Sequence, residues 1–591
     1  MPPTAGAGIH WQVGQATSLA NIRFEMVRGG GNNKQQGIFM DNGSGGFMTD
    51  LIFNGGNYGA FLGNQQFTTR NLTFNDCNTA IFMNWNWGWT LKSITVNNCK
   101  VGIDMANSPA NQTVGSVLLM DSKFNNVELA VNTSFGQNSI PVTGGTLIVD
   151  NVDFGGARTA VRSAANANAL AGGSTVQSWV QGAIYNGNQR TRTFSAISGP
   201  NKPAGLLAGG KFFERTKPQY EGLPASAFIS IKDSGARGDG VTDDTAAIQR
   251  ALDSVPEGRV LYFDHGYYVV TSTLNVPKNI KIVGEIWPLI LAKGAFFNDQ
   301  ANPKPVFKVG NPGESGAVEI SDLMFETMGP AAGAIMIQWN LNGAQGANGL
   351  WDTHVRIGGS AGTQLQSDKC SKAPTADHSN PNPGCIGAYL MFHATQSASV
   401  YMENDWFWVS DHELDRSDHN QIDIYNGRGV LLESQNPVWL YGTASEHSVI
   451  YQYQLSKAKN VFMGFIQTET PYYQSNPQAP APFNVQAATD PKFAGDKLTN
   501  KAWGLRIVDS SDVFIYGAGL YSFFENYGQT CLDPQNCQTN MVSYEGANTN
   551  VALFGLSTKA AVNMISNNGR PIALDKDNRS NFCATLGLYY I

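Results

Sequence analysis

The stretch 233-DSGARGDGVTDDTAAI-248 joins a turn-rich segment to the beginning of a helix. Three glycines and four aspartates precede Thr245, a composition typical of tight turns. Thr and Asp within 242–245 are good helix N-caps, and acidic residues there suit the positive end of the helix dipole. The apolar residues that then recur at helical spacing are Ala247, Ile248, Ala251 and Leu252. We therefore predict a short amphipathic helix here, with one face turned to an apolar core.

Short strand-like pieces of one pattern recur upstream of this helix, each a polar residue followed by apolar ones. They are 21–24, 50–53, 71–74, 93–96 and 150–154. The spacing from Phe53 to Phe74 is 21 residues, and that from Phe74 to Val96 is 22. A period in the low twenties with several short strands per unit is typical of a parallel β-helix. Similar pieces return after residue 229, so the sequence predicts an all-β fold with two tandem β-helices.

The segment 200–228 is rich in proline and glycine and carries no periodic pattern. Such composition is typical of a linker. We therefore predict a first β-helix over 1–199, a linker over 200–228, and a second β-helix over 229–591 that begins with the predicted cap helix.

The overall composition excludes several classes of protein. Only 14% of the 591 residues are charged, the net charge is −7, and no block of Lys and Arg occurs. A nucleic acid or an anionic membrane would require a basic surface, so neither is an expected partner. No run of 18 apolar residues indicates a membrane span. With 12 Trp and 20 Tyr, a neutral, hydroxyl-rich substrate fits best.

The cysteines and glycosylation sequons favour a secreted protein. By proximity, the cysteines pair as Cys77–Cys99, Cys370–Cys385 and Cys531–Cys537, which leaves Cys583. The first pair is 22 residues apart, one coil, and two free buried thiols are the alternative. Sequons begin at Asn42, Asn71, Asn111, Asn132 and Asn578. The N-terminus has neither the basic region nor the apolar region of a signal peptide.

The stretch 233–248 resembles the opening signature of the pectate-lyase-like superfamily. The stretches 8–19, 39–47, 433–442 and 465–473 further resemble glycoside hydrolase family 55, and this resemblance covers nearly the whole chain. It implies two right-handed parallel β-helices packed side by side, with the active site in the cleft between them. It also implies hydrolysis of β-1,3-glucan from the non-reducing end, with inversion and release of glucose, and without a cofactor or metal.

One departure from the family concerns the first β-helix. Members normally carry a second copy of the opening signature at its start, behind a signal peptide. In this sequence the first module begins partway through its coils. We therefore expect a chain that lacks its N-terminal coils, and a naturally short form is the alternative.

Glu446 and Glu469 are the candidate catalytic pair. They are 23 residues apart, one coil, so their backbones are expected on neighbouring rungs. Two adjacent carboxylates cannot both ionise easily, so one pKa should rise, as a general acid requires. The resemblance assigns the acid to Glu469 and places Glu446 in the hydrogen-bonded relay around the nucleophilic water. On the residues alone, a carboxylate ladder along a solvated face is the alternative.

An inverting hydrolase also needs groups that hold the attacking water on the far side of the sugar. The family pattern suggests a glutamine and a serine from the facing helix, and the nearest matches are Gln15 and Ser44. Gln12 is a rival for Gln15, since strand alternation sends these positions to opposite faces. Ordinary turn chemistry in 42–46 is the alternative for Ser44.

Aromatic residues near the pair are candidates for sugar contact. Tyr472 and Tyr473 lie beside Glu469 in the sequence, and Trp406 and Trp408 offer flat apolar faces. Core packing is the alternative for the tryptophans. The acidic run 403–418, with His412 and the nearby His419, is interpreted as a polar loop and not as a metal site.

Two other functions remain open on the sequence alone. A pectin-active enzyme on the same fold is one, although neither a Gly-His-Gly nor an Arg-Ile-Lys motif of polygalacturonases occurs. A non-catalytic carbohydrate-binding relic of a glucanase is the other. We expect a monomeric, extracellular protein whose partner is β-1,3-glucan.

Overall fold

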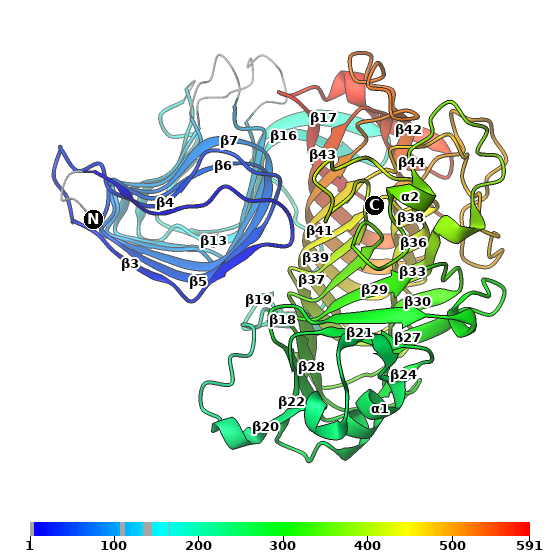
Figure 1. Ribbon diagram of the computed structural model, residues 1–591. Helices are drawn as coiled ribbons and strands as arrows, with labels where there is room; N and C mark the ends of the chain where they lie inside the picture. The colour runs from blue at the N-terminus through cyan, green and yellow to red at the C-terminus, as the bar shows by residue number, and fades with distance from the viewer. Residues whose placement is uncertain (1–4, 107–112, 134–144, 165) are drawn as a thin grey trace.

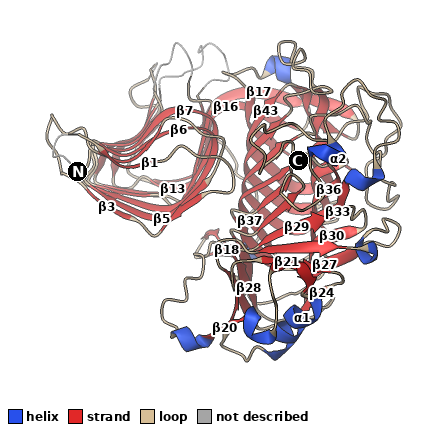
Figure 2. Ribbon diagram, viewed as in Figure 1, coloured by secondary structure: helices blue, strands red, loops and turns tan. Residues whose placement is uncertain are grey.

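The computed structural model describes residues 5–106, 113–133, 145–164 and 166–591. The chain forms two parallel β-helices that lie side by side, the first in blue and cyan and the second in green to red (Figure 1). Strands make up nearly all of their regular structure, and the few short helices lie at turns and ends (Figure 2). The predicted fold class, all-β with two parallel β-helices packed side by side, is confirmed.

The first β-helix stacks its strands in parallel register, and an antiparallel hairpin follows it. Its strands are β1 Ala7–His10, β2 Ser18–Ala20, β3 Arg23–Glu25, β4 Gln36–Met40, β5 Phe47–Asn54, β6 Tyr58–Asn75, β7 Thr79–Lys92, β8 Thr95–Asn97, β9 Val101–Asp104, β10 Ser116–Met120, β11 Lys123–Asn125, β12 Val127–Asn132, β13 Thr146–Asp153, β14 Ala157–Arg162 and β15 Leu170–Ala171. The hairpin consists of β16 Thr175–Asn186 and β17 Gln189–Ala196.

The second β-helix has three faces, and two of them share one sheet with the first β-helix. The elements of these two faces are β20 Phe228–Ser230, β21 Asp239–Asp243, β22 Val260–Phe263, β23 Tyr267–Val270, β25 Ile280–Gly284, β26 Leu289–Lys293, β28 Val318–Ser321, β29 Met324–Met328, β31 Asn348–Trp351, β32 His354–Ile357, β34 Val400–Glu403, β35 Trp406–Val409, β37 Val438–Glu446, β39 Lys459–Glu469, β41 Ser511–Tyr521, β43 Thr549–Lys559 and β46 Ala584–Tyr590.

The third face is a separate ten-stranded sheet. Its strands are β24 Leu274–Val276, β27 Lys304–Val309, β30 Ala334–Trp339, β33 Ile386–Ala394, β36 Tyr425–Leu432, β38 Tyr451–Ser456, β40 Trp503–Val508, β42 Gln538–Glu545, β44 Ala561–Asn567 and β45 Arg570–Leu574. The remaining elements are β18 Leu207–Ala208, β19 Lys211–Phe212, α1 Thr245–Ser254, α2 Ser367–Cys370 and the 3-10 turns η1 Ala204–Leu206, η2 Ala225–Ala227, η3 Ile231–Ser234, η4 Ala295–Phe297, η5 Pro383–Cys385 and η6 Asp575–Asp577. Among the described residues, no helix has both the length and the apolar character needed to cross a lipid bilayer.

The predicted cap helix is α1, and its buried residues are those that the periodicity indicated: Ala247, Ile248, Ala251 and Leu252. Asp244 precedes the helix, but its carboxylate accepts hydrogen bonds from the backbone N–H groups of Arg237 and Gly238, at 2.7 and 2.9 Å. The carboxylate of Asp243, one residue before the N-cap position of Asp244, accepts from Thr245 N at 3.0 Å instead. The aspartates of this stretch therefore fix the turn and the helix start.

The predicted stacking of successive coils in the first β-helix is observed as side-chain stacks, although the coils vary in length, from 21 residues between Phe53 and Phe74 to 29 between Phe24 and Phe53. Phe24, Phe53 and Phe74 are in register on successive rungs, with ring centroids 4.7 and 4.6 Å apart. The residues that begin these pieces, among them Asn21, Asp50 and Asn71, have left-handed backbones, which Asn and Asp tolerate better than most residues. The recurring polar residue is thus a turn residue, and the phenylalanines form the core.

A hairpin and the connecting segment join the two β-helices. β16 pairs antiparallel with β13 of the first helix and parallel with β46 of the second. Residues 200–228, predicted as a linker, pack between the helices, where Leu206 and Phe212 are buried in an aromatic cluster that both helices share. The two β-helices are therefore held by a continuous apolar interface in addition to the covalent connection.

A buried ionic cluster lies beside this interface. Arg70 of the first helix donates from Nε to Glu403 Oε2 of the second helix at 2.9 Å, and only 2% of the Arg70 side chain is exposed. Asp50 and Glu214 also contact this guanidinium, at 3.3 and 3.6 Å. Burying a charge is costly unless it is paired. Because these ion pairs form only when the two helices pack in this arrangement, the cluster stabilises their relative position.

Two of the three predicted disulfides are present, Cys370–Cys385 and Cys531–Cys537. The predicted Cys77–Cys99 bond is not formed: both residues are buried free thiols, and so is Cys583. Each of the two thiols points back to the carbonyl oxygen two residues earlier, of Asn75 at 3.7 Å and of Asn97 at 3.4 Å. One-coil spacing places the cysteines on neighbouring rungs, where the two thiols contact each other but no bond joins the sulfur atoms.

The predicted glycosylation sites differ in accessibility. Asn42 and Asn71 are exposed. Asn578 is buried, and its Nδ2 donates to Tyr185 Oη at 2.7 Å and to Leu574 O at 2.8 Å, so the folded chain cannot carry a glycan there. Asn111 lies outside the described residues.

Candidate active site

A pocket of about 600 Å³ lies where the second β-helix faces the turns of the first. Its floor is the outer surface of β29, β32, β35, β37 and β39, which supply Met324, His354, Trp406, Glu446 and Glu469. The first helix contributes residues from three stacked turns, namely Gln15, Ala16, Ser44 and Gln65. The segment after β41 adds Phe523, Phe524 and Gln529. The pocket therefore spans six rungs, about 24 Å at the usual strand spacing.

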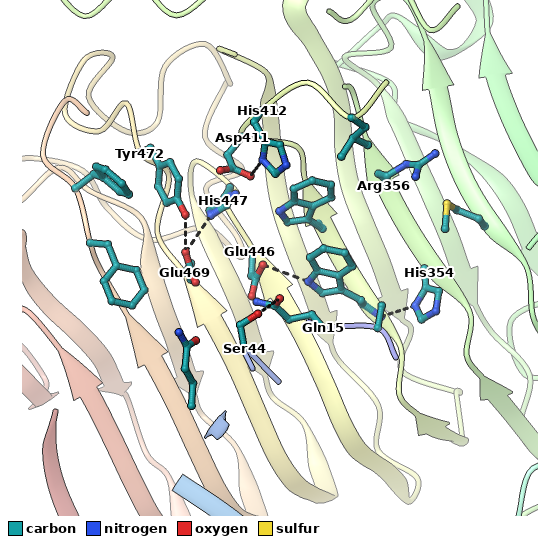
Figure 3. A pocket seen from close by; sticks show the side chains of 18 of the residues that line it. Gln15, Ser44, His354, Arg356, Asp411, His412, Glu446, His447, Glu469 and Tyr472 are labelled. Carbon is teal, nitrogen blue, oxygen red and sulfur yellow. Dashed lines mark hydrogen bonds and ion pairs between the residues drawn. The ribbon is translucent and has the colours of Figure 1, made fainter. Parts of the chain in front are cut away.

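The two candidate glutamates end neighbouring strands. Ala444 of β37 is in register with Gln467 of β39, so Glu446 and Glu469 occupy equivalent positions two residues further on. Figure 3 shows both carboxyl groups pointing into the same pocket, with Ser44 and Gln15 close to Glu446. The placement predicted from the one-coil spacing is thus observed.

The strands that carry this pair bend before they reach it. Each of β37, β39, β41 and β43 has one residue with a left-handed backbone at the bend: Gly442, Phe465, Gly517 and Gly555. At Gly442 a Cβ atom would lie 2.5 Å from the Phe47 ring of the first helix, so only glycine fits this close approach. Phe465 adopts the same conformation without being glycine, and such backbone strain is typical of functional sites. The bends turn the strand ends toward the pocket.

Glu446 is fully buried and accepts two hydrogen bonds. Trp406 Nε1 donates to its Oε2 at 3.2 Å, and Gln467 Nε2 donates to its Oε1 at 2.6 Å. Burial, followed by repulsion from the Glu469 carboxylate, raises the pKa of Glu446 to about 8. The raised pKa thus falls on Glu446, the residue expected to serve the water. Because the two adjacent carboxyl groups titrate together, it means that the pair keeps one proton at neutral pH.

A chain of amides connects Glu446 to the first β-helix. Gln66 Nε2 donates to Gln467 Oε1 at 2.9 Å and also to Ser44 O at 2.9 Å. Ser44 Oγ donates to Gln15 Oε1 at 3.1 Å. Gln15 lines the pocket, whereas Gln12 is exposed and does not. Of the two glutamines that the sequence left open, the structure therefore brings Gln15 to the site.

Glu469 is held through one of its two oxygens. Tyr472 Oη donates to Oε2 at 2.9 Å, and His447 Nε2 lies 3.6 Å from the same oxygen. Within the described part of the chain, no hydrogen-bond partner of Oε1 is found, and the side chain lines the pocket. Oε1 is therefore the oxygen available to a substrate.

The predicted aromatic contacts are brought to the pocket with one exception. Trp406 and Trp408 line it with their rings stacked, 4.7 Å between centroids, and Tyr472 lines it too. Tyr473 is 5% exposed and does not line it; its hydroxyl donates to Ile424 O at 3.2 Å, and its ring packs against Tyr425. The expectation for Tyr473 is corrected, because the turn after β39 directs Tyr473 into the core and only Tyr472 faces the pocket.

Several pocket residues were not singled out by the sequence. His354 is buried; burial lowers its pKa to about 4, so the ring is neutral, and its Nδ1 accepts from Trp406 N at 3.2 Å. His447 and Asp411 lie near the glutamates, and Gln66 and Gln467 form the amide chain. His354 is level with Trp406 on the neighbouring rung, and His447 follows Glu446 in the sequence, so the coil spacing could have indicated that both lie at the site. The amide chain could not be predicted in this way, because it depends on how the two helices pack.

Several carboxylates of the acidic run 403–418 form ion pairs and hydrogen bonds with neighbouring parts of the fold. Glu403 pairs with Arg70, Asp405 accepts from Thr353 N at 2.9 Å, and Glu413 accepts from Gln366 Nε2 at 2.8 Å. In the part of the chain that the structure describes, no group of three or more His, Cys, Asp or Glu side chains is placed to hold a metal ion.

The pair should impose an alkaline limit on the reaction. If turnover requires one proton on Glu446 and Glu469 together, kcat/KM is expected to fall about tenfold per pH unit above about pH 8, since the pKa of Glu446 is raised to about 8. The Trp406 hydrogen bond lowers this pKa, so Trp406→Phe should move the limb to higher pH. A pH–rate profile measures both. A limb centred below pH 6, or one that moves to lower pH in the variant, would contradict this assignment.

Comparison with known proteins agrees with the resemblance noted in the sequence. The chain is 49% identical to the probable glucan endo-1,3-β-glucosidase of Arthroderma benhamiae, over 99% of this chain and 78% of that protein. It is 43% identical to the glucan 1,3-β-glucosidase of Cochliobolus carbonum, over 99% of this chain and 75% of that protein. The chain belongs to glycoside hydrolase family 55. The names of these two family 55 relatives differ, because only the first specifies internal cleavage.

Two further matches were found. The family described as rhamnogalacturonase A/epimerase, pectate lyase-like, matches residues 1–104 and 228–345 of this family 55 chain. Among solved structures, sacteLam55A from Streptomyces sp. SirexAA-E is similar with a TM-score of 0.44 and 14% identity, over 95% of this chain and 88% of that one.

Proposed function

We propose that this protein hydrolyses β-1,3-glucan from the non-reducing end, with inversion, and releases glucose. The observation that carries the proposal is the pair of carboxyl groups on neighbouring rungs, Glu446 and Glu469, inside a pocket walled by tryptophans. The names of the family 55 relatives support the substrate and the reaction class.

The position of the pair along the pocket supports removal of a terminal unit. The floor extends from Met324 on β29 to Glu469 on β39, and Phe523 and Phe524 follow one rung later. Toward the C-terminus, the pocket extends only one rung beyond Glu469. Toward the N-terminus it extends over four rungs, whose lining residues include Trp406, Trp408 and Met324. A glucan cut at the pair would leave a short unit on the side of Phe523 and its longer remainder on the tryptophan side.

The roles follow from the surroundings of each carboxyl group: Oε1 of Glu469 faces the pocket, and Glu446 is connected through the amide chain to the turns that carry Ser44 and Gln15. Glu469 donates a proton from Oε1 to the glycosidic oxygen, the C1–O bond breaks, and its electron pair stays on the leaving oxygen. A water held near Ser44 and Gln15 forms the new bond to C1 and gives a proton to Glu446. A carboxyl whose pKa is raised to about 8 is suited to hold this proton. The proton then passes from Glu446 to Glu469 before the next cycle, so the pair carries one proton throughout.

Digestion of laminarihexaose tests the proposal. We expect glucose and laminaripentaose as the first products, and with a tag on the reducing end we expect the tag to stay on the longer fragment. Internal cleavage is the contrary result for the chain-end preference. Binding without any product would favour the carbohydrate-binding relic, and cleavage of polygalacturonate instead of laminarin would favour the pectin-active alternative.

We further propose that the protein acts outside the cell. The disulfides Cys370–Cys385 and Cys531–Cys537 support this location, because such bonds persist in oxidising compartments. The second of them closes the segment that follows Phe523, Phe524 and Gln529, so it also steadies one wall of the pocket. The monomeric state stays a prediction.

A further inference from the structure

Two donors converge on the same oxygen of Glu469. Tyr472 Oη is 2.9 Å from Oε2, and His447 Nε2 is 3.6 Å from it, as the dashed lines of Figure 3 show. His447 is buried and Tyr472 is partly exposed beside the pocket, and the Tyr472 ring packs between His447 and Phe524, with centroids 4.7 and 4.0 Å away. Both contacts of the Glu469 carboxyl group are therefore made through Oε2.

His447 is itself fixed by its backbone and by its other nitrogen. Its backbone is left-handed, with φ at 65°, and its N–H donates to Glu469 O on the next rung at 2.9 Å. Nδ1 lies 3.0 Å from Val409 O. Because a carbonyl oxygen only accepts, Nδ1 carries a hydrogen, and Nε2 is left facing Glu469 with no nearer partner among the described residues.

The charges around His447 favour its protonated form. Glu469 faces it from β39, Asp411 from the segment after β35, and Glu446 precedes it on the same strand. Burial alone lowers the pKa of His447, but the contact with Glu469 and the charge of Asp411 outweigh it and raise the pKa to about 9. Nε2 then also carries a hydrogen and can donate to Glu469.

We propose that His447, together with Tyr472, is a positioning residue for Glu469: the hydrogen bond from Tyr472 and the ion pair with His447 hold the carboxyl group by Oε2 and so direct Oε1 at the glycosidic oxygen. This rests on the function proposed above. When Oε1 gives up its proton, the carboxylate that remains keeps both donors, so the group does not need to reorient during the step. No atom of His447 or Tyr472 is transferred to the substrate.

Two replacements of His447 separate its two nitrogens. His447→Asn places an amide near the position of Nδ1, suits the left-handed backbone, and loses the donor toward Glu469. His447→Gln can return an N–H to the position of Nε2. The control is His265→Asn, the same change at an exposed histidine outside the pocket.

The test compares laminarin with β-glucosyl fluoride, whose leaving group departs without a proton from an acid. For His447→Asn we expect kcat on laminarin to fall on the order of 10²-fold, as for a catalytic group held loosely, while turnover of the fluoride stays within about threefold of wild type. His447→Gln should recover part of the laminarin activity, and Tyr472→Phe should show the same split to a smaller degree. The His265→Asn control should match wild type on both substrates.

Equal losses on both substrates, or no loss on laminarin, would overturn the proposal. Should His447→Asn fail to fold, Tyr472→Phe gives the same comparison without a change at a left-handed position. A wild-type protein that hydrolyses the fluoride but not laminarin would instead contradict the proposed substrate, so the two failures can be told apart.

Discussion

Glu469→Gln is expected to reduce kcat/KM for laminarin by about 10²–10⁴-fold, the usual loss when a positioned general acid is removed. The amide keeps the shape of the side chain and can still accept the hydrogen bond from Tyr472, so the pocket should remain intact. It has no proton to donate from the position of Oε1, the oxygen that faces the substrate. Initial-rate kinetics on laminarin measures the loss.

The comparison variant for this change is Glu257→Gln, an exposed glutamate outside the pocket, which should match wild type. Hydrolysis of β-glucosyl fluoride by Glu469→Gln should be largely retained, because fluoride leaves without protonation. If the variant keeps more than about a tenth of the laminarin activity, the proton comes from another group.

Arg70→Met is expected to lower the free energy of unfolding by about 3–5 kcal/mol, the usual cost of removing one partner from a buried ion pair. Met fills a similar volume, but it leaves Glu403 buried without the guanidinium that pairs with it at 2.9 Å. Since Arg70 belongs to the first helix and Glu403 to the second, the loss should also loosen the approach of Gln15 and Ser44 to the glutamates. Urea unfolding followed by tryptophan fluorescence measures the change.

Two further variants isolate the buried charge as the cause. Arg23→Met removes an exposed arginine that pairs with Glu25, and it should change stability by less than about 0.5 kcal/mol. Adding Glu403→Gln to Arg70→Met should restore part of the lost stability, because the unpaired charge is then gone. A double variant less stable than Arg70→Met would show that the cost arises from lost packing instead.

The periodic features were predictable from the sequence because each repeats a local pattern. The phenylalanines at 53 and 74 are 21 residues apart, one predicted coil, and stacking in register follows from the geometry of a coil. The same rule placed Glu446 and Glu469 on neighbouring rungs. The cap helix was predictable because its apolar spacing lies within one short stretch.

What the sequence could not predict depends on contacts between the two helices or on the direction of single side chains. Gln66 and Gln467 are 401 residues apart, and nothing in either segment indicates their hydrogen bond. Tyr472 and Tyr473 are equivalent as sequence, and only the path of the chain after β39 decides which one faces the pocket. Cys77 and Cys99 have the spacing of one coil, yet their sulfur atoms point to separate carbonyls.

The most direct test of the proposed mechanism is the configuration of the glucose at the moment of release. Proton NMR recorded during the first minutes of laminarihexaose hydrolysis distinguishes α-glucose from β-glucose before mutarotation mixes them. Water that attacks C1 from the face opposite the leaving group, with Glu446 as the proton acceptor and Glu469 as the donor, predicts α-glucose first. Early accumulation of β-glucose would mean that configuration is retained, and it would contradict the roles assigned to both glutamates.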